Sequence, residues 1–141
     1  MAASVLVADD EDSIRRLLAL ALSDAGYDVS TASDGVEAFQ KFQAADVDVL
    51  VTDLKIGRID GYELCRRVRE TSALPIVVIS GALVEDEAPG SLDSSLDADV
   101  LIRKPFDVTE LVRLVRGLVP PDSPRANGGE AEAVKGDRRT D

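Results

Sequence analysis

The sequence predicts an α/β protein built on a doubly wound parallel sheet. Short apolar runs of strand length alternate along the chain with longer stretches in which apolar residues recur at helical spacing. The run over residues 47–52 is almost continuously apolar, as expected of a central parallel strand that is covered on both faces. Repeated strand–helix units of this kind join into one sheet through right-handed crossovers.

The first half of the chain contains two strand–helix units. An apolar run over residues 4–8 forms the first strand, and the helix that follows begins near Asp12 and ends at Gly26, a residue suited to a helix stop. A second strand is predicted over residues 27–32, and a turn over residues 33–35 leads into the next helix. The apolar positions that carry these two helices are Ile14, Leu17, Leu18, Ala21, Leu22 and Ala25, then Val36, Phe39 and Phe42.

The second half continues the alternation. After the central strand, a loop over residues 54–60 leads to a helix, and further strands are predicted over residues 75–79 and near residues 100–103. The helical apolar positions here are Leu64, Cys65 and Val68, then Val108, Leu111, Val112, Val115 and Leu118.

Two segments depart from this rhythm. Between Ser80 and Ala98 the chain carries an acidic cluster and the pair Pro89-Gly90, which would interrupt a helix, so we expect only one or two helical turns with mobile chain around them. Residues 120–141 combine prolines, glycines and scattered charge with few large apolar side chains, and we expect them to be a disordered tail behind a domain over residues 1–119.

Composition excludes several classes of function. The 141 residues carry a formal net charge of −11, which opposes direct binding to nucleic acid and to anionic lipid. No apolar stretch approaches the roughly 18 residues that membrane insertion requires, and the start lacks the basic region of a signal peptide. One cysteine fits a reducing, cytoplasmic location, and the absence of histidine excludes histidine bases, metal ligands and phosphocarriers.

Polar residues stand at the ends of four predicted strands. Asp9 and Asp10 follow the first, Asp53 the third, Ser80 the fourth and Lys104 the last. The carboxyl ends of parallel strands meet at one edge, where open α/β sheets bind ligands. Carboxylates suit Mg²⁺, a carboxylate can accept a phosphoryl group, and a lysine and a hydroxyl can hold the phosphoryl oxygens.

Each of these residues also has a simpler interpretation. Asp9 and Asp10 could cap the following helix, and Asp53 could stabilise a loop. Ser80 could satisfy a backbone group, and Lys104 could be an ordinary surface lysine. Taken singly, these simpler interpretations are favoured, but the ordered set at four strand ends favours one functional site.

The order Asp9-Asp10, Asp53, Ser80 and Lys104-Pro105-Phe106 resembles the receiver domain of two-component response regulators, over residues 4–119. The resemblance implies a flavodoxin-like receiver fold, a five-stranded parallel sheet in the order 2-1-3-4-5 with helices on both faces.

The resemblance also implies a role for each residue of the site. Asp53 would be the phosphoacceptor, and Mg²⁺ would be held by Asp9, Asp10, Asp53 and the backbone carbonyl of Leu54. Ser80 would be the switch hydroxyl, with Gly81 leaving room for the phosphoryl group. Lys104 would bind phosphate ahead of a cis bond to Pro105.

The sequence departs from the family pattern in four places. Ile56-Gly57 stands where Met-Pro is usual, which implies a looser loop after the phosphoacceptor. The switch position that is usually aromatic is Leu101, and Asp97 replaces a glycine before the last strand. The span from Ser80 to Lys104 is longer than usual. The last three departures fall on the output face and bear on signalling rather than on phosphorylation.

These features predict a stand-alone, monomeric receiver and not an enzyme, beyond self-catalysed transfer to Asp53 and hydrolysis from it. Its partners would be a histidine kinase or phosphotransfer protein and an unidentified downstream protein. Two alternatives remain open: a pseudo-receiver that is not phosphorylated, and an aspartate-nucleophile phosphatase. The phosphatase would need a second aspartate two residues after Asp53, where this chain has Lys55.

Overall fold

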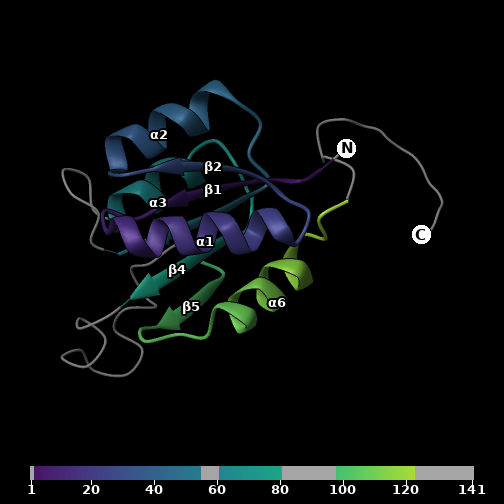
Figure 1. Cartoon of the computed structure of the whole chain (residues 1–141). Coiled ribbons are helices and arrows are strands. Elements are labelled where there is room, and N and C mark those ends of the chain that lie inside the picture. Colours follow the sequence, from purple (N-terminus) through teal and green to yellow (C-terminus); the bar gives the residue numbers. More distant parts are fainter. Residues whose placement is uncertain (1, 55–60, 81–97, 123–141) are drawn as a thin grey trace.

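The computed structural model describes residues 2–54, 61–80 and 98–122. It contains one five-stranded parallel sheet in the order β2-β1-β3-β4-β5 (Figure 1). This confirms the predicted fold class and strand order. The elements are β1 (Ser4–Ala8), α1 (Asp12–Asp24), β2 (Asp28–Ala32), α2 (Gly35–Ala44), β3 (Val49–Asp53), α3 (Gly61–Arg69), β4 (Ile76–Ser80), β5 (Val100–Arg103) and α6 (Val108–Leu118).

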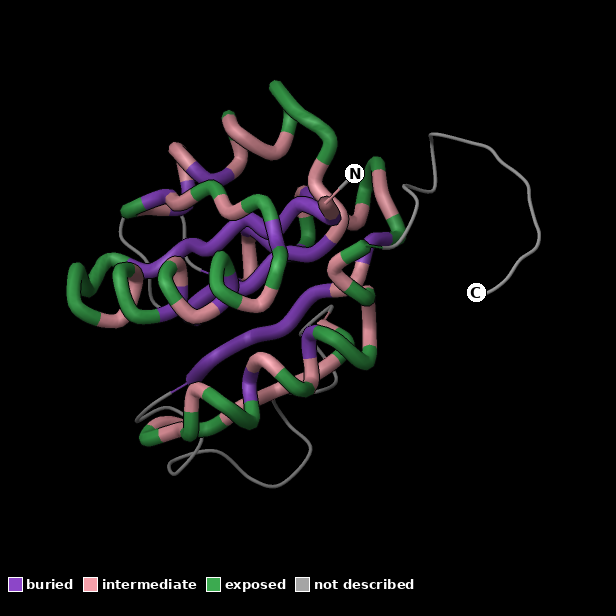
Figure 2. Tube along the Cα trace, turned by 45° about the vertical axis from the view of Figure 1, so that its right-hand side comes forward, coloured by how far each residue is buried: buried purple, intermediate pink, exposed green. Residues whose placement is uncertain are grey.

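Helices cover both faces of the sheet and divide the core into two layers. Helices α1 and α6 lie on one face, and α2 and α3 lie on the other (Figure 1). The three central strands β1, β3 and β4 are buried along their whole length, whereas the edge strands β2 and β5 are only partly covered (Figure 2). The alternating residues of each central strand therefore serve both layers, which explains why these strands are apolar without a two-residue period.

Local chemistry sets the ends of the first two helices. Gly26, just beyond α1, has a φ of +105°, a left-handed conformation that glycine adopts without strain. The Asp34 carboxylate accepts the Glu37 N–H at 2.8 Å, and the Glu37 carboxylate accepts the Ser33 N–H at 2.8 Å, which forms a reciprocal cap at the start of α2.

Three predicted strands have bounds that differ by one or two residues from those in the structure. Strand β2 begins at Asp28 rather than Tyr27, because the Tyr27 side chain is buried in the α1–α6 layer and its hydroxyl donates to the Val119 carbonyl at 2.6 Å. Strand β3 spans Val49–Asp53 rather than residues 47–52, so the candidate phosphoacceptor is the last residue of the strand. Strand β4 begins at Ile76 rather than at residue 75 and ends at Ser80.

The predictions for residues 55–60, 81–97 and 123–141 lie outside the described residues. They concern Lys55, Ile56-Gly57, the interrupted segment around Pro89-Gly90, and most of the predicted tail. The chain remains in contact with the domain slightly past the predicted boundary at residue 119, because the Ala3 N–H donates to the Pro121 carbonyl at 2.6 Å.

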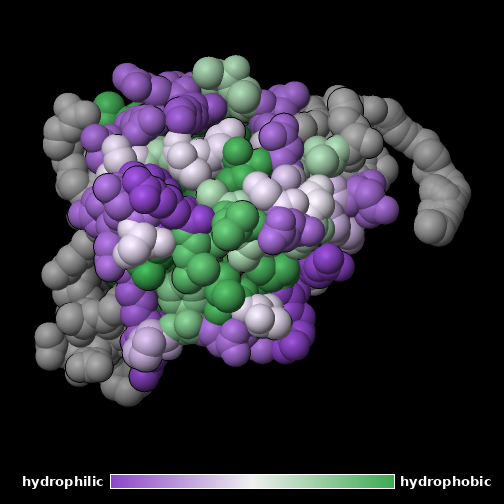
Figure 3. Space-filling model, in the orientation of Figure 1, coloured by the Kyte–Doolittle hydropathy of each residue, from purple (hydrophilic) through white to green (hydrophobic). Residues whose placement is uncertain are grey.

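The face that carries α1 and α6 is partly apolar at its surface (Figure 3). Among the described residues, the large hydrophobic side chains that are exposed are Leu17 and Leu20, both on α1. None of the described helices combines the length and the apolar character that crossing a bilayer would demand.

Candidate metal and phosphoryl site

The five predicted site residues meet at the carboxyl edge of the sheet. Asp9 and Asp10 follow β1, Asp53 ends β3, Ser80 ends β4, and Lys104 follows β5. The sheet order reverses between β1 and β3, since β1 leads outward to β2 on one side and β3 leads to β4 on the other. A crevice at such a reversal point is the usual ligand site of doubly wound sheets.

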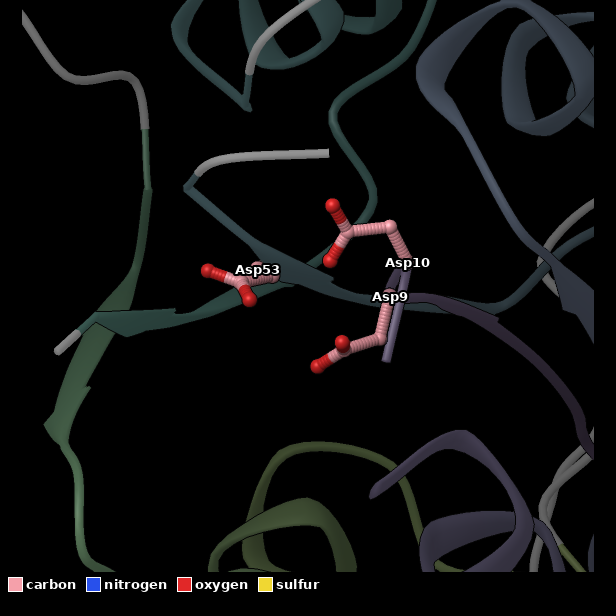
Figure 4. Close-up of side chains that lie close together, drawn as sticks. All are labelled: Asp9, Asp10 and Asp53. Carbon is pink, nitrogen blue, oxygen red and sulfur yellow. The ribbon is translucent and has the colours of Figure 1, made fainter. Parts of the chain in front are cut away.

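Three carboxylates share one space at this edge. One oxygen from each of Asp9, Asp10 and Asp53 lies within 4.8 Å of the other two. The three side chains face a common volume between the ends of β1 and β3 (Figure 4). Asp9 and Asp53 are buried and Asp10 is exposed, so the cluster extends from the core to the surface.

Two hydrogen bonds fix Asp9, one through its backbone N–H and one through a carboxylate oxygen. Its N–H donates to the Ala32 carbonyl at 3.1 Å, and its Oδ1 accepts the Glu11 N–H at 2.8 Å. Its other oxygen, Oδ2, is buried and has no hydrogen-bond partner among the described residues. Buried carboxylate oxygens normally accept hydrogen bonds, so one that accepts none and lies near two further carboxylates is suited to a cation.

The surroundings of Asp9 make its ionisation harder than that of an ordinary aspartate. Burial raises the pKa of Asp9 from 3.8 to about 6. The backbone hydrogen bond from Glu11 opposes this rise. The negative charges of Asp53 and, to a smaller extent, of Asp10 raise the pKa of Asp9 further, whereas the positive charge of Lys104 lowers it.

Lys104 lies close to three carboxylates of the site. Its Nζ donates to Asp53 Oδ2 at 2.9 Å and lies 3.9 Å from both Asp9 Oδ2 and Glu11 Oε1. Burial acts to lower the pKa of Lys104, but the hydrogen bond to Asp53 and the nearby carboxylate charges outweigh burial and raise it. The lysine is therefore a firmly charged group. The bond to Pro105 is cis, as the family resemblance implied.

Ser80 lies at the floor of the site beside Lys104. It is 1% exposed, and its Oγ has no hydrogen-bond partner among the described residues. Its carbonyl accepts the Lys104 N–H at 2.8 Å, which fixes the start of the lysine-bearing loop. The predicted switch residue Leu101 lies on β5, paired in register with Val78, and is half-buried against the α2–α3 layer.

The Leu54 carbonyl, predicted as a further metal ligand, already has a partner. It accepts the Gly61 N–H at 2.7 Å, which joins the end of β3 to the start of α3. A Cβ at Gly61 would lie 2.7 Å from the Asp53 carbonyl oxygen and from Leu54 Cα, so only glycine fits this approach. A carbonyl oxygen has two lone pairs, so this hydrogen bond is compatible with the metal role of the Leu54 carbonyl, which stays a prediction.

The simpler interpretations of these residues fit the structure less well. The residue before α1 is Glu11, and its own side chain makes no capping hydrogen bond. Asp9 accepts the Glu11 N–H through Oδ1 alone, so its second oxygen is not used at the start of the helix. Lys104 is an ion-pair partner rather than a free surface lysine. The Ser80 hydroxyl satisfies no backbone group among the described residues.

Two contacts escaped the sequence analysis. Glu11 approaches Lys104, and the Arg15 guanidinium donates to the Asp9 carbonyl at 2.8 Å. The available signal was the position of Arg15 one helical turn after Glu11, on the side of α1 that faces the strand ends.

The donor set fits a hard divalent cation such as Mg²⁺. Such an ion prefers oxygen ligands, retains several waters and needs only a few carboxylates. The carboxylates of Asp9, whose Oδ2 accepts no hydrogen bond among the described residues, of the exposed Asp10 and of the strand-end Asp53 meet these requirements.

Comparisons with known proteins agree with this geometry. Residues 5–116 match the response regulator receiver domain family. A probable transcriptional regulator, ycf27, of Cyanophora paradoxa is 39% identical over 82% of this chain and 47% of its own length. The response regulator MprA of Mycobacterium bovis is 38% identical over 96% of this chain and 58% of its own. This chain thus spans about half the length of the curated relatives that it matches.

Solved structures give the same result for the fold. The chemotaxis protein CheY4 of Vibrio cholerae superimposes with a TM-score of 0.75 at 31% identity, covering 84% of this chain and all of that one. A putative response regulator from Chloroflexus aurantiacus gives 0.73 at 32% identity, covering 84% of this chain and 98% of that one. The chain belongs to the response regulator receiver domain family of two-component signalling proteins.

Proposed function

We propose that this domain is a phosphorylation-dependent switch that accepts a phosphoryl group on Asp53. The donor would be a phosphohistidine of a histidine kinase or phosphotransfer protein. The observation that carries the proposal is the contact between Lys104 Nζ and Asp53 Oδ2 at 2.9 Å, beside two further carboxylates. A strand-end carboxylate held by a cation, next to a partnerless carboxylate oxygen, suits nucleophilic attack on phosphorus.

In the proposed step an Asp53 carboxylate oxygen attacks the phosphorus of the donor. The new P–O bond forms as the P–N bond to imidazole breaks, and the imidazole nitrogen leaves with the bonding electron pair. The product is an aspartyl phosphate. Asp53 lies at the end of β3, and its carboxylate forms an ion pair with Lys104. The carboxylate therefore has little freedom to turn away from the donor.

Charge balance determines which residues take part. The transferred group brings negative oxygens to a space that already holds three carboxylates, and Mg²⁺ bound there would neutralise much of that charge. Lys104 can shift its hydrogen bond from Asp53 Oδ2 to a phosphoryl oxygen, since its Nζ is 2.9 Å from the atom that would carry the group. Asp9 and Asp10 would hold the ion opposite the lysine.

Ser80 supplies a route for the signal to leave the site. Its buried, partnerless hydroxyl can donate to a phosphoryl oxygen on Asp53, which ends the neighbouring strand. Such a bond would draw the end of β4 toward β3. Leu101, half-buried on β5 beside β4, would feel that movement, and a downstream protein would bind the altered surface.

The test is phosphoryl uptake from acetyl phosphate and Mg²⁺, followed by intact-protein mass spectrometry. The wild type should gain one phosphoryl group, and Asp53→Asn should gain none while keeping its circular dichroism spectrum. Asp24→Asn removes the same charge from an exposed position at the end of α1 and should behave like the wild type. Failure of the wild type to take up phosphate or to bind beryllofluoride would favour the pseudo-receiver. Release of phosphate from a small phosphomonoester would favour the phosphatase.

A further inference from the structure

Arg15 makes a contact that ordinary helix chemistry does not explain. Its guanidinium donates to the backbone carbonyl of Asp9 at 2.8 Å and also pairs with the Asp12 carboxylate. The Arg15 side chain is only 18% exposed, so most of it has left water to make these contacts.

The position of Arg15 is unfavourable for the helix alone. Arg15 ends the first turn of α1, where the positive end of the helix dipole disfavours cations. The pairing with Asp12 is an ion pair three residues apart at the surface, and such pairs add little to helix stability. Helix stability therefore gives little reason for an arginine to be held here.

The carbonyl that Arg15 contacts belongs to the peptide unit joining Asp9 to Asp10, the two acidic residues that follow β1. The Asp9 N–H is fixed by Ala32, and its Oδ1 by the Glu11 N–H. Arg15 adds the third constraint, on the carbonyl. With these three groups engaged, Asp9 Oδ2 remains directed at the site, and the direction in which Asp10 leaves the backbone is set.

We propose that Arg15 is a positioning residue for the metal site. It holds the Asp9–Asp10 peptide so that both carboxylates face the same cation without having to reorganise. This inference rests on the proposed Mg²⁺ site. Neighbours that orient metal ligands typically change metal affinity by about 10- to 100-fold when they are removed.

Charge and positioning predict opposite results for this residue, which makes the inference testable. By Coulomb's law alone, removing a cation next to three carboxylates should make Mg²⁺ bind more tightly. Loss of a positioning contact should make it bind more weakly. The sign of the change in Mg²⁺ affinity therefore separates the two roles.

The experiment is calorimetric titration of metal-stripped protein with Mg²⁺, with no phosphodonor present. Arg15→Gln should weaken binding by roughly tenfold. Arg16→Gln is the matched control, because it removes the same charge from the neighbouring exposed position and should change affinity by less than about twofold. Arg15→Lys keeps the charge and one donor and should recover part of the loss.

Asp12→Asn separates the two contacts of Arg15. It removes the ion pair and leaves the hydrogen bond to the Asp9 carbonyl, so Mg²⁺ affinity should stay within about threefold of the wild type. Circular dichroism of each variant without metal reports whether it folds. If Arg15→Gln does not fold, the comparison of Arg15→Lys with Arg16→Lys takes its place, with weaker binding expected only for Arg15→Lys.

The outcomes distinguish this inference from the proposed function. If the wild type binds no Mg²⁺, the proposed metal site itself is wrong. If the wild type binds and folded Arg15→Gln binds equally well or more tightly, Arg15 is not a positioning residue although the site stands. A loss of equal size in Arg16→Gln would likewise overturn the inference, because it would show a general effect of charge.

Discussion

Replacing Asp9 by asparagine should stabilise the metal-free protein, and the gain should depend on pH. The Asp9 side chain is 1% exposed, and its Oδ2 has no hydrogen-bond partner among the described residues. Burial raises the pKa of Asp9 from 3.8 to about 6, so folding opposes ionisation of this group. An asparagine keeps an oxygen for the Glu11 N–H and places an amide, rather than a charge, beside Asp53.

The sign follows from proton linkage. Because the folded pKa is higher than the unfolded one, the protonated form is favoured by folding, and its contribution is fully present only below about pH 4. That contribution is lost as the pH rises through about 6. A tenfold difference in ionisation constant corresponds to about 1.4 kcal/mol. Relative to its protonated form, Asp9 therefore lowers the free energy of unfolding by about 1.5 kcal/mol at pH 5 and by about 3 kcal/mol at pH 7.5.

Urea unfolding in EDTA, followed by circular dichroism, measures this effect without tryptophan, which the chain lacks. Asp9→Asn should exceed the wild type in free energy of unfolding by about 3 kcal/mol at pH 7.5 and by about half of that at pH 5. Asp24→Asn, at an exposed position, should change stability by less than about 0.5 kcal/mol at both. Excess Mg²⁺ should reduce or reverse this difference in free energy of unfolding, because the wild type binds Mg²⁺ more tightly than Asp9→Asn and is stabilised more by it. A variant less stable than the wild type at pH 7.5 would refute the reasoning.

Two further substitutions test the packing of the site. Ser80→Ala removes a buried hydroxyl that has no hydrogen-bond partner among the described residues. The metal-free protein should lose less than about 1 kcal/mol of unfolding free energy in urea, and beryllofluoride should bind more weakly. A larger loss of stability would reveal a structural hydrogen bond. Gly61→Ala places a Cβ 2.7 Å from backbone atoms of Asp53 and Leu54 and should destabilise by about 1–3 kcal/mol. A Cβ at Gly117 in α6 would meet nothing within 4 Å, so Gly117→Ala should instead stabilise the protein by about 0.5–1 kcal/mol. Equal effects of the two glycine substitutions would contradict the close packing of Gly61 against the end of β3.

The fold was predictable because its signals are local and repeated. The apolar runs that became β1, β3 and β4 are buried on both faces, and α1 ends before Gly26 as its backbone requires. The meeting of Asp9, Asp53 and Lys104 was predictable because parallel strands bring their carboxyl ends to one edge.

The finer chemistry of the site was not predictable in the same way. The partners of Asp9 are backbone groups and a guanidinium, and which of them it meets depends on side-chain directions that spacing does not determine. The engagement of the Leu54 carbonyl by Gly61 likewise depends on how α3 approaches the end of β3. Periodicity predicts which element a residue belongs to, and tertiary packing decides its contacts.

The identity of the phosphorylated residue tests the central claim most directly. Protein treated with acetyl phosphate and Mg²⁺ is reduced with borohydride, which converts an aspartyl phosphate to homoserine and leaves free carboxylates unchanged. Peptide mass spectrometry then locates the homoserine. We predict homoserine at Asp53 alone, the carboxylate that Lys104 holds at 2.9 Å. Homoserine at Asp9 or Asp10, or at none of the aspartates, would contradict the account.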